Sequence, residues 1–316
     1  MKRALVFAVA ATLACGGAGS GPPVQIVIPD GATLGDAADT LAARGVIRSP
    51  RWFRWYATLL RKSDDIRAGV YRLPTGMSAG RALAALAGGR AALQRLVVPE
   101  GMMLSEVAGT VSRQLGLPRA DIEKAATDSA LLARAESPGP TLEGYLYPST
   151  YLVRYGAPAP EILAQMVDGF TAHWRPEWNA RLDSLKLTRH QVVTLASIVE
   201  SEMRYEPDRK YIASVYYNRL RRGMRLQADP TVIYALGKRR RLWEKDYLFR
   251  SRYNTYLVDG LPPGPVGQPL AASIEAALYP AESSFLYFVA QPDGKHVFSR
   301  TYREHINAIN AVRRKN

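Results

Sequence analysis

The fold of the C-terminal half is decided by the stretch Thr188–Met203, whose sequence is TRHQVVTLASIVESEM. Thr188 is followed three residues later by Gln191, which has the form of a capping box, so a helix is expected to begin there and to run to Met203. Its apolar stripe consists of Val192, Ala196, Val199 and Met203. The stretch therefore predicts a helix with one face packed into a core.

Two glutamates lie near the end of this helix, and helical geometry gives them different surroundings. At about 100° per residue, Glu200 lies beside the apolar stripe, at a partly buried edge. Glu202 projects on the opposite flank, near Leu195 and Ile198, because residues two apart on a helix do not face each other. Burial favours the protonated carboxyl that a general acid requires. We therefore expect Glu200, without Glu202, to be the catalytic acid.

An ordinary glycosidase needs a second carboxylate, and Asp229 is the obvious candidate. Asp229 stands directly before Pro230, however, which is the pattern of an N-cap followed by proline at the first helical position. That leaves Glu200 as a lone acid, which suits lytic chemistry: one carboxyl protonates the glycosidic oxygen and then removes a proton from the sugar's own hydroxyl. The competing structural interpretation is a salt bridge from Glu200 to Arg204 or Arg219.

The N-terminus has the features of an export segment. Lys2 and Arg3 precede an apolar run, Ala4–Ala14, which is too short for a bilayer-spanning helix and is typical of a signal peptide ending near residue 21. Cys15, the single cysteine, follows that run and resembles the lipid-acceptor cysteine of bacterial lipoproteins. We expect a cell-envelope protein that is held on the membrane and faces the periplasm, with an uncleaved transmembrane anchor as the alternative.

The composition narrows the range of partners. The chain has 316 residues with a formal net charge of +14, so its surface favours polyanions. It has no zinc-finger spacing, phosphate-binding glycine loop or RNA-binding aromatic motif, and we expect no nucleic-acid partner. The four histidines, which are His173, His190, His296 and His305, have no metal-ligand spacing, and we assign them no chemistry and expect no cofactor.

The N-terminal half contains a weak duplication. A short β run, a Pro-acid-Gly turn and a helix occur at residues 27–38 and again at 97–108, and each copy later reaches a Gly-aromatic-Pro segment, Gly69–Pro74 or Gly144–Pro148. Two α+β modules, 22–92 and 93–155, are expected, with Gly88–Arg90 as the hinge between them. A mixed helical and β domain, 156–316, should follow and include a hairpin around Pro292–Gly294, so the fold class is α+β.

Several motifs occur together in a fixed order. They are LASIVESE at 195–202, YNRL at 217–220, MRLQADPTVIY at 224–234, YNTY at 253–256, GLPPGP at 260–265 and LYFV at 286–289, with LEGYLYP upstream at 142–148. The set resembles the YceG-like (MltG) endolytic murein transglycosylases over nearly all of the chain after residue 21. The resemblance implies that Glu200 is the catalytic glutamate and that the N-terminal module is LysM-like. It also implies cleavage between N-acetylmuramic acid and N-acetylglucosamine to give 1,6-anhydro ends, as a terminator of nascent peptidoglycan strands beside the wall synthases (penicillin-binding proteins).

Polar and aromatic residues of these motifs are candidates for sugar binding. Amide side chains can hydrogen-bond acetamido groups, tyrosines can form a wall for sugar rings, and an arginine can face carboxylates of the substrate. The candidates are Asn218, Arg219, Gln227, Asp229, Tyr253, Asn254 and Tyr256. Two alternatives to the transglycosylase are a non-catalytic wall-binding scaffold and a hydrolase that pairs Glu200 with Asp229.

Overall fold

The computed structural model describes residues 19–29, 31–88 and 93–314 of the chain. The predicted signal segment, Cys15 and most of the predicted hinge lie outside these residues. No helix in the described ranges is both long enough and apolar enough to cross a membrane.

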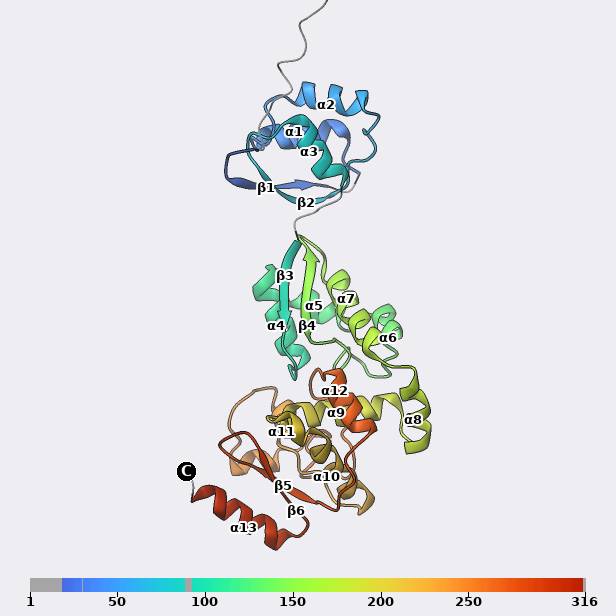
Figure 1. The fold of residues 1–316 in the computed structure, drawn as a ribbon, viewed down its shortest axis with the longest axis vertical. Helices are drawn as coiled ribbons and strands as arrows, with labels where there is room; N and C mark the ends of the chain where they lie inside the picture. Colours follow the sequence, from blue (N-terminus) through green and yellow to red (C-terminus); the bar gives the residue numbers. More distant parts are fainter. Residues whose placement is uncertain (1–18, 30, 89–92, 315–316) are drawn as a thin grey trace, which may run out of the picture. The chain divides into compact units, whose positions relative to one another are not determined.

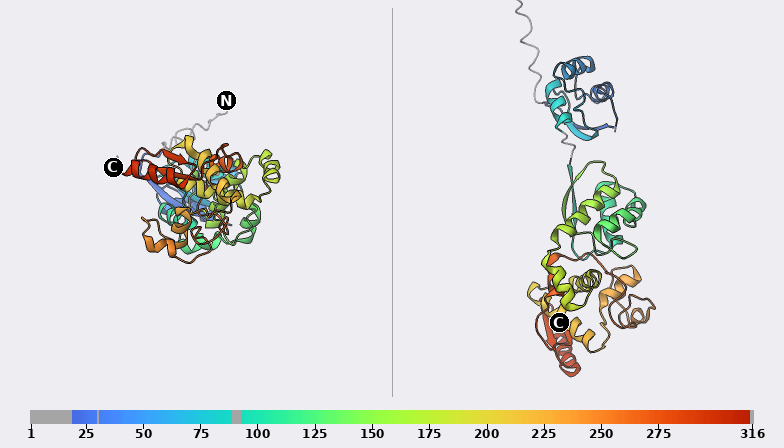
Figure 2. Two further views of the ribbon diagram at one scale, coloured as in Figure 1. Left: turned by 90° about the horizontal axis from the view of Figure 1, so that it is seen from below. Right: turned by 90° about the vertical axis from the view of Figure 1, so that its right-hand side faces the viewer.

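The chain forms two compact units with an α+β composition (Figures 1 and 2). Unit 1 comprises the chain up to Arg95 together with Leu152–Ala157, and unit 2 comprises Leu96–Tyr151 together with the chain from Pro158 onward. Residues 96–151 thus pack with the C-terminal part, and the expected boundary at residue 155 does not separate two compact bodies. The expected boundary at 92 lies close to the end of the first segment of unit 1.

Unit 1 is built around one antiparallel strand pair. Its elements are β1 (Pro23–Ile28), α1 (Leu34–Ala43), α2 (Pro50–Leu59), β2 (Gly69–Pro74) and α3 (Ala79–Ala87). Strands β1 and β2 pair over their whole length, from Pro23 opposite Pro74 to Ile28 opposite Gly69. The three helices lie on one side of this pair in Figure 1, and α2 packs on α1 and α3. The first predicted Gly-aromatic-Pro segment is therefore a strand that closes its module.

The remaining elements belong to unit 2, except that the strands Leu93–Val98 and Ser149–Arg154 each have residues in both units. They are β3 (Leu93–Val98), α4 (Leu104–Leu115), α5 (Arg119–Ala125), α6 (Ser129–Ala135), β4 (Ser149–Arg154), α7 (Ala159–His173), α8 (Glu177–Leu185), α9 (Arg189–Glu202), η1 (Glu206–Asp208), α10 (Arg209–Arg221), α11 (Asp229–Leu236), η2 (Glu244–Leu248), α12 (Ala271–Leu278), β5 (Tyr287–Ala290), β6 (His296–Ser299) and α13 (Tyr302–Arg313).

The second Gly-aromatic-Pro segment differs from the first. Gly144–Pro148 precedes β4 instead of forming a strand, and the strand that pairs with β3 is β4. Gly144 has φ +86°, and a side chain at this position would collide with Pro265. This packing holds the segment against the middle of unit 2 as buried irregular backbone, so the two copies of the duplication agree only in their first half.

Helix α9 is the central helix of unit 2. The predicted capping box is confirmed, because the Gln191 N–H donates to the Thr188 hydroxyl at 3.2 Å and the Thr188 N–H donates to the Gln191 side chain at 2.8 Å. Helices α8, α10, α11 and α12 all pack against α9. Every residue from Val192 to Glu200 is consequently buried. The expected one-sided stripe is thus wrong, because neighbours surround the helix.

The C-terminal hairpin is confirmed. Strands β5 and β6 are antiparallel, with Tyr287 opposite Ser299 and Ala290 opposite His296, and Gly294 supplies the positive φ of the turn. Helix α13 packs on both strands and lies beside them at one end of unit 2 in Figure 1 and in the right-hand view of Figure 2.

Candidate active site

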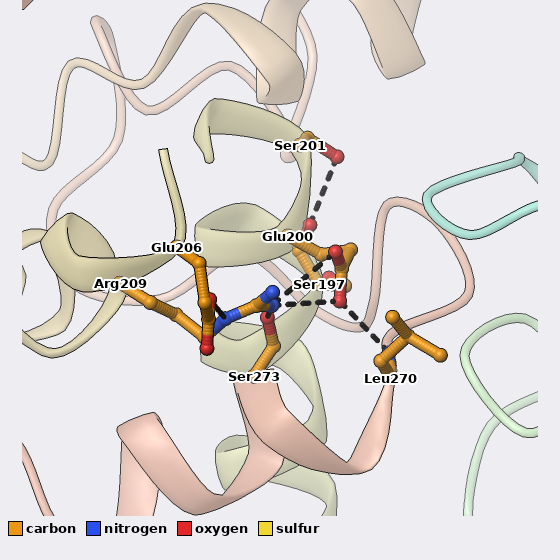
Figure 3. Close-up of polar contacts among 7 residues, drawn as sticks. All are labelled: Ser197, Glu200, Ser201, Glu206, Arg209, Leu270 and Ser273. Atoms are coloured by element: carbon orange, nitrogen blue, oxygen red, sulfur yellow. Dashed lines mark hydrogen bonds and ion pairs between the residues drawn. The ribbon is translucent and has the colours of Figure 1, made fainter. Parts of the chain in front are cut away.

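Glu200 lies in a buried polar cluster formed by α9, the start of α10 and the start of α12 (Figure 3). Its side chain is 1% exposed, its Oε2 accepts the Leu270 N–H at 2.8 Å, and the Arg209 Nη1 lies 3.3 Å from the same oxygen. Arg209 also contacts Glu206 through its Nε at 3.0 Å and donates to the Ser273 hydroxyl. Glu200 therefore joins three elements of unit 2 through one carboxylate.

This placement corrects two expectations about Glu200. The side chain is fully buried, whereas the sequence predicts a partly buried edge, and its ion-pair partner is Arg209, whereas the competing structural interpretation named Arg204 or Arg219. The ion pair between Glu200 and Arg209 could not be predicted from helical spacing. The two residues are nine positions apart and lie on different helices, because the chain turns between α9 and α10.

A cavity of about 370 Å³ lies at the end of α9, and Glu202 lines it whereas Glu200 does not. Its volume is in the range of small-ligand sites. Part of its lining comes from α10, the start of α11 with the loop before it, and the YNTY motif; these residues are Tyr216, Arg219, Gln227, Asp229 and Tyr256. The C-terminal hairpin and α13 supply further lining residues, which include Tyr287, Phe288, His296, Tyr302 and His305.

Glu202 has the environment expected of a general acid. Its half-buried carboxyl accepts a hydrogen bond from the Tyr216 hydroxyl at 3.2 Å. The pKa of Glu202 is raised to about 7, chiefly by burial and in addition by the negative charge of Asp229, while the Tyr216 hydrogen bond and the charges of Arg204 and Arg219 oppose the rise. A carboxyl with a pKa near neutrality can both donate and recover a proton.

Asp229 is also a cavity residue, and the predicted N-cap role is wrong. Ala228 is the N-cap of α11 and makes no side-chain capping bond, while Asp229 is the first helical residue. The Asp229 carboxylate accepts hydrogen bonds from the Tyr256 hydroxyl at 2.7 Å and from the Tyr247 hydroxyl at 3.5 Å. These bonds hold it in the cavity as a fixed negative charge near Glu202.

Arg219 and Gln227 line the cavity as well. The Arg219 guanidinium donates to the Leu286 carbonyl and to the Leu226 carbonyl, each at 2.7 Å, and stacks over the Tyr287 ring with 5.1 Å between its central carbon and the ring centroid. Burial lowers the pKa of Arg219 below its ordinary value. Gln227 has φ +48°, a conformation uncommon for a side-chain-bearing residue, and aims its amide oxygen toward Arg219 at 3.5 Å.

The other three predicted sugar-binding residues do not line the cavity. The Asn218 amide donates to the carbonyls of Ser283 and Phe285, both at 2.9 Å. The buried Asn254 amide donates to the carbonyls of Tyr247 and Phe249 at 3.0 and 2.8 Å. Tyr253 packs its ring on Tyr234 with 4.6 Å between centroids. These side chains shape the loops around the site.

Sequence reasoning missed several cavity residues. Glu202 was set aside because it faces away from Glu200, and His296 and His305 were assigned no chemistry although both line the cavity. His296 is held by Asp208, whose carboxylate lies 3.0 Å from its Nδ1. The available signal was the second glutamate of the IVESE motif and the two adjacent aromatic residues of LYFV, whose placement in the cavity depends on the packing of the hairpin against α10.

Asp229→Asn should move the pH dependence of cleavage. If Glu202 is the acid, activity falls as the pH rises through its pKa of about 7. Asp229 raises that pKa, so its neutralisation lowers it and shifts the descending limb to lower pH, by on the order of one unit. The pH profile of glycan cleavage measures this shift. Asp259→Asn, which alters an exposed carboxylate outside the cavity, is the control and should leave the limb in place; an unmoved limb in Asp229→Asn contradicts the assignment.

Comparisons with known proteins agree over most of the chain. A model of the YceG-like family matches residues 26–311. An endolytic murein transglycosylase of Bacillus subtilis (strain 168) is 32% identical over 301 residues, which cover 90% of this chain and 83% of that protein. An endolytic murein transglycosylase of Streptococcus pneumoniae serotype 2 (strain D39) is 31% identical over 319 residues, which cover 89% of this chain and 57% of that longer protein.

A solved structure shows the same similarity. The 2.6 Å crystal structure of a YceG-like protein from Listeria monocytogenes superimposes with a TM-score of 0.63 at 35% sequence identity, covering 92% of this chain and all of that one. Sequence and fold therefore agree: the chain belongs to the YceG-like family.

Proposed function

We propose that the protein is a peptidoglycan lytic transglycosylase and that Glu202, not Glu200, is its catalytic acid and base. The observation that carries this proposal is the position of Glu202 in a cavity lined with tyrosines, an arginine and a second carboxylate, with a pKa raised to about 7. The names of the relatives, endolytic murein transglycosylase, supply the substrate class.

The reaction uses one carboxyl twice. Protonated Glu202 gives its proton to the oxygen between N-acetylmuramic acid and N-acetylglucosamine, and the bond from that oxygen to the muramic C1 breaks. The negative charge of Asp229 stabilises the positive charge that develops on the muramic ring. The Glu202 carboxylate then takes the proton of the ring's own C6 hydroxyl, whose oxygen bonds to C1. The product is a 1,6-anhydro end, the acid is restored, and no water is consumed.

The remaining cavity residues hold the strand. Tyr256, Tyr287 and Phe288 offer aromatic surface to sugar rings, and Arg219 offers a cation to carboxylates of the substrate. We further propose that unit 1 acts as a LysM-like glycan-holding module and that cleavage ends nascent strands beside the wall synthases. Support for the first part is the closed α+β organisation of unit 1; support for the second is the endolytic activity named in the relatives.

A two-carboxylate muramidase is the second candidate, because Glu202 and Asp229 line the same cavity. In a hydrolase, Asp229 would act as nucleophile or base and water would attack C1. The alternative predicted from sequence paired Asp229 with Glu200, which the buried ion pair with Arg209 disfavours.

Product analysis in labelled water separates the two candidates. Glycan strands are digested in water enriched in ¹⁸O, and the new ends are identified by mass spectrometry. The lytic reaction should give anhydro ends without label, since its ring closure uses the sugar's own oxygen. Reducing ends that carry ¹⁸O would establish the hydrolase and contradict the lytic mechanism, and an unchanged polymer would favour the non-catalytic scaffold.

A further inference from the structure

Helix α2 of unit 1 carries an exposed apolar face that no function described above uses. Trp52 and Trp55 are 52% and 53% exposed, and their rings stack with 4.7 Å between centroids. Leu59, one turn further, is 60% exposed. The spacing of three and four residues places the three side chains on one side of the helix. The opposite side buries Phe53 and Ala57 in the core of unit 1, so the exposed residues are not needed for that core. We call Trp52, Trp55 and Leu59 the α2 face.

The surroundings of the α2 face are basic. Between Thr40 and Ser63 the chain has no acidic residue and six basic ones, which are Arg44, Arg48, Arg51, Arg54, Arg61 and Lys62. All of them except the half-buried Arg54 are exposed. One of them, Arg54, lies 4.0 Å from the Asp39 carboxylate, a loose and solvent-exposed contact. The stretch therefore presents indole rings together with cations.

This combination fits an anionic lipid surface better than an uncharged polymer. Indole rings favour the boundary between headgroups and acyl chains, and a helix with an apolar face and flanking Lys and Arg binds in the plane of that boundary. Cations near the boundary are attracted by anionic headgroups.

We propose that the α2 face docks unit 1 onto an anionic bilayer. The helix lies in the plane of the interface, Trp52, Trp55 and Leu59 enter the headgroup and upper acyl region, and Arg48, Arg51 and Lys62 contact lipid phosphates. Neither the catalytic mechanism nor the lipidation of Cys15 is required for this docking, so its failure and that of the proposed function are distinguishable.

The test measures the fluorescence of Trp52 and Trp55. The full chain is reconstituted into vesicles of phosphatidylcholine alone or with phosphatidylglycerol, with brominated acyl chains in both, and tryptophan quenching is measured. Quenching is expected with the anionic vesicles and should be several-fold weaker without phosphatidylglycerol or at high salt. Trp52→Ala/Trp55→Ala should leave the emission of the other three tryptophans unquenched. Arg48→Glu/Arg51→Glu keeps both indoles and should weaken docking by roughly tenfold or more.

Matched controls make the result decisive. Trp243→Ala removes an indole of unit 2 that is 56% exposed, and it should leave the lipid-dependent quenching in place. Circular dichroism and thermal melting should be unchanged in every variant, because the altered side chains lie outside the core. Equal quenching with both lipids, or an equal effect of Trp243→Ala, overturns the proposal. The absence of any quenching of Trp52 and Trp55 by brominated lipid also overturns the proposal, and that result would favour a protein partner for the α2 face.

Discussion

Glu202→Gln is expected to abolish glycan cleavage while the protein stays folded. Glutamine fills the same volume and can still accept the Tyr216 hydrogen bond, but it has no proton to give to the glycosidic oxygen. Because Glu202 would serve as both acid and base, the loss should be about a thousandfold or more. Release of anhydro ends from isolated strands measures it, and thermal melting and strand binding verify that the variant folds and still holds substrate.

Glu200→Gln is the matched control for this experiment. The substitution is chemically identical and only two residues away on α9, yet it alters a side chain bound to Arg209 and the Leu270 N–H instead of one that lines the cavity. We expect lowered thermal stability and, well below the melting temperature, activity within roughly tenfold of the unaltered protein. If folded Glu200→Gln lost cleavage completely while Glu202→Gln retained it, Glu200 would be the acid, as the motif resemblance implies.

Arg209→Ala is expected to have the largest effect on stability. The substitution leaves the buried Glu200 carboxylate without its cation and removes the link to Ser273. Breaking a buried ion pair by removing one partner costs about 3–5 kcal/mol, because the other charge stays in a poorly solvated site. For a folded unit of the size of unit 2, the melting temperature should fall by roughly 6–20 °C.

An exposed ion pair provides the comparison. Arg134 and Asp168 are joined at 2.5 Å, but their side chains are 51% and 50% exposed. Arg134→Ala should therefore change the free energy of unfolding by about 1 kcal/mol or less. Differential scanning calorimetry of both variants measures the contrast. Similar small losses in the two would mean that the Glu200 cluster does not hold α9, α10 and α12 together.

Local sequence signals were sufficient to predict several helices and strands. The start of α9 follows from a capping box within four residues, and the hairpin β5–β6 follows from two β runs around Pro292–Gly294. These features depend on interactions between near neighbours in the chain, so periodicity and turn chemistry predict them. The Gly144–Pro148 segment was not predictable in this way, because its conformation is fixed by a distant residue, Pro265.

The sequence alone determined the family, the α+β class and the helix that carries the two glutamates. It could not determine which glutamate faces a cavity, because helical angles describe one helix and say nothing of what surrounds it. Only the tertiary structure brought Arg209 to Glu200 across a turn of the chain, and placed Asp229 and the C-terminal hairpin around Glu202. Burial and charge at a site arise from residues far apart in sequence, and those two quantities decide which carboxyl can act as an acid.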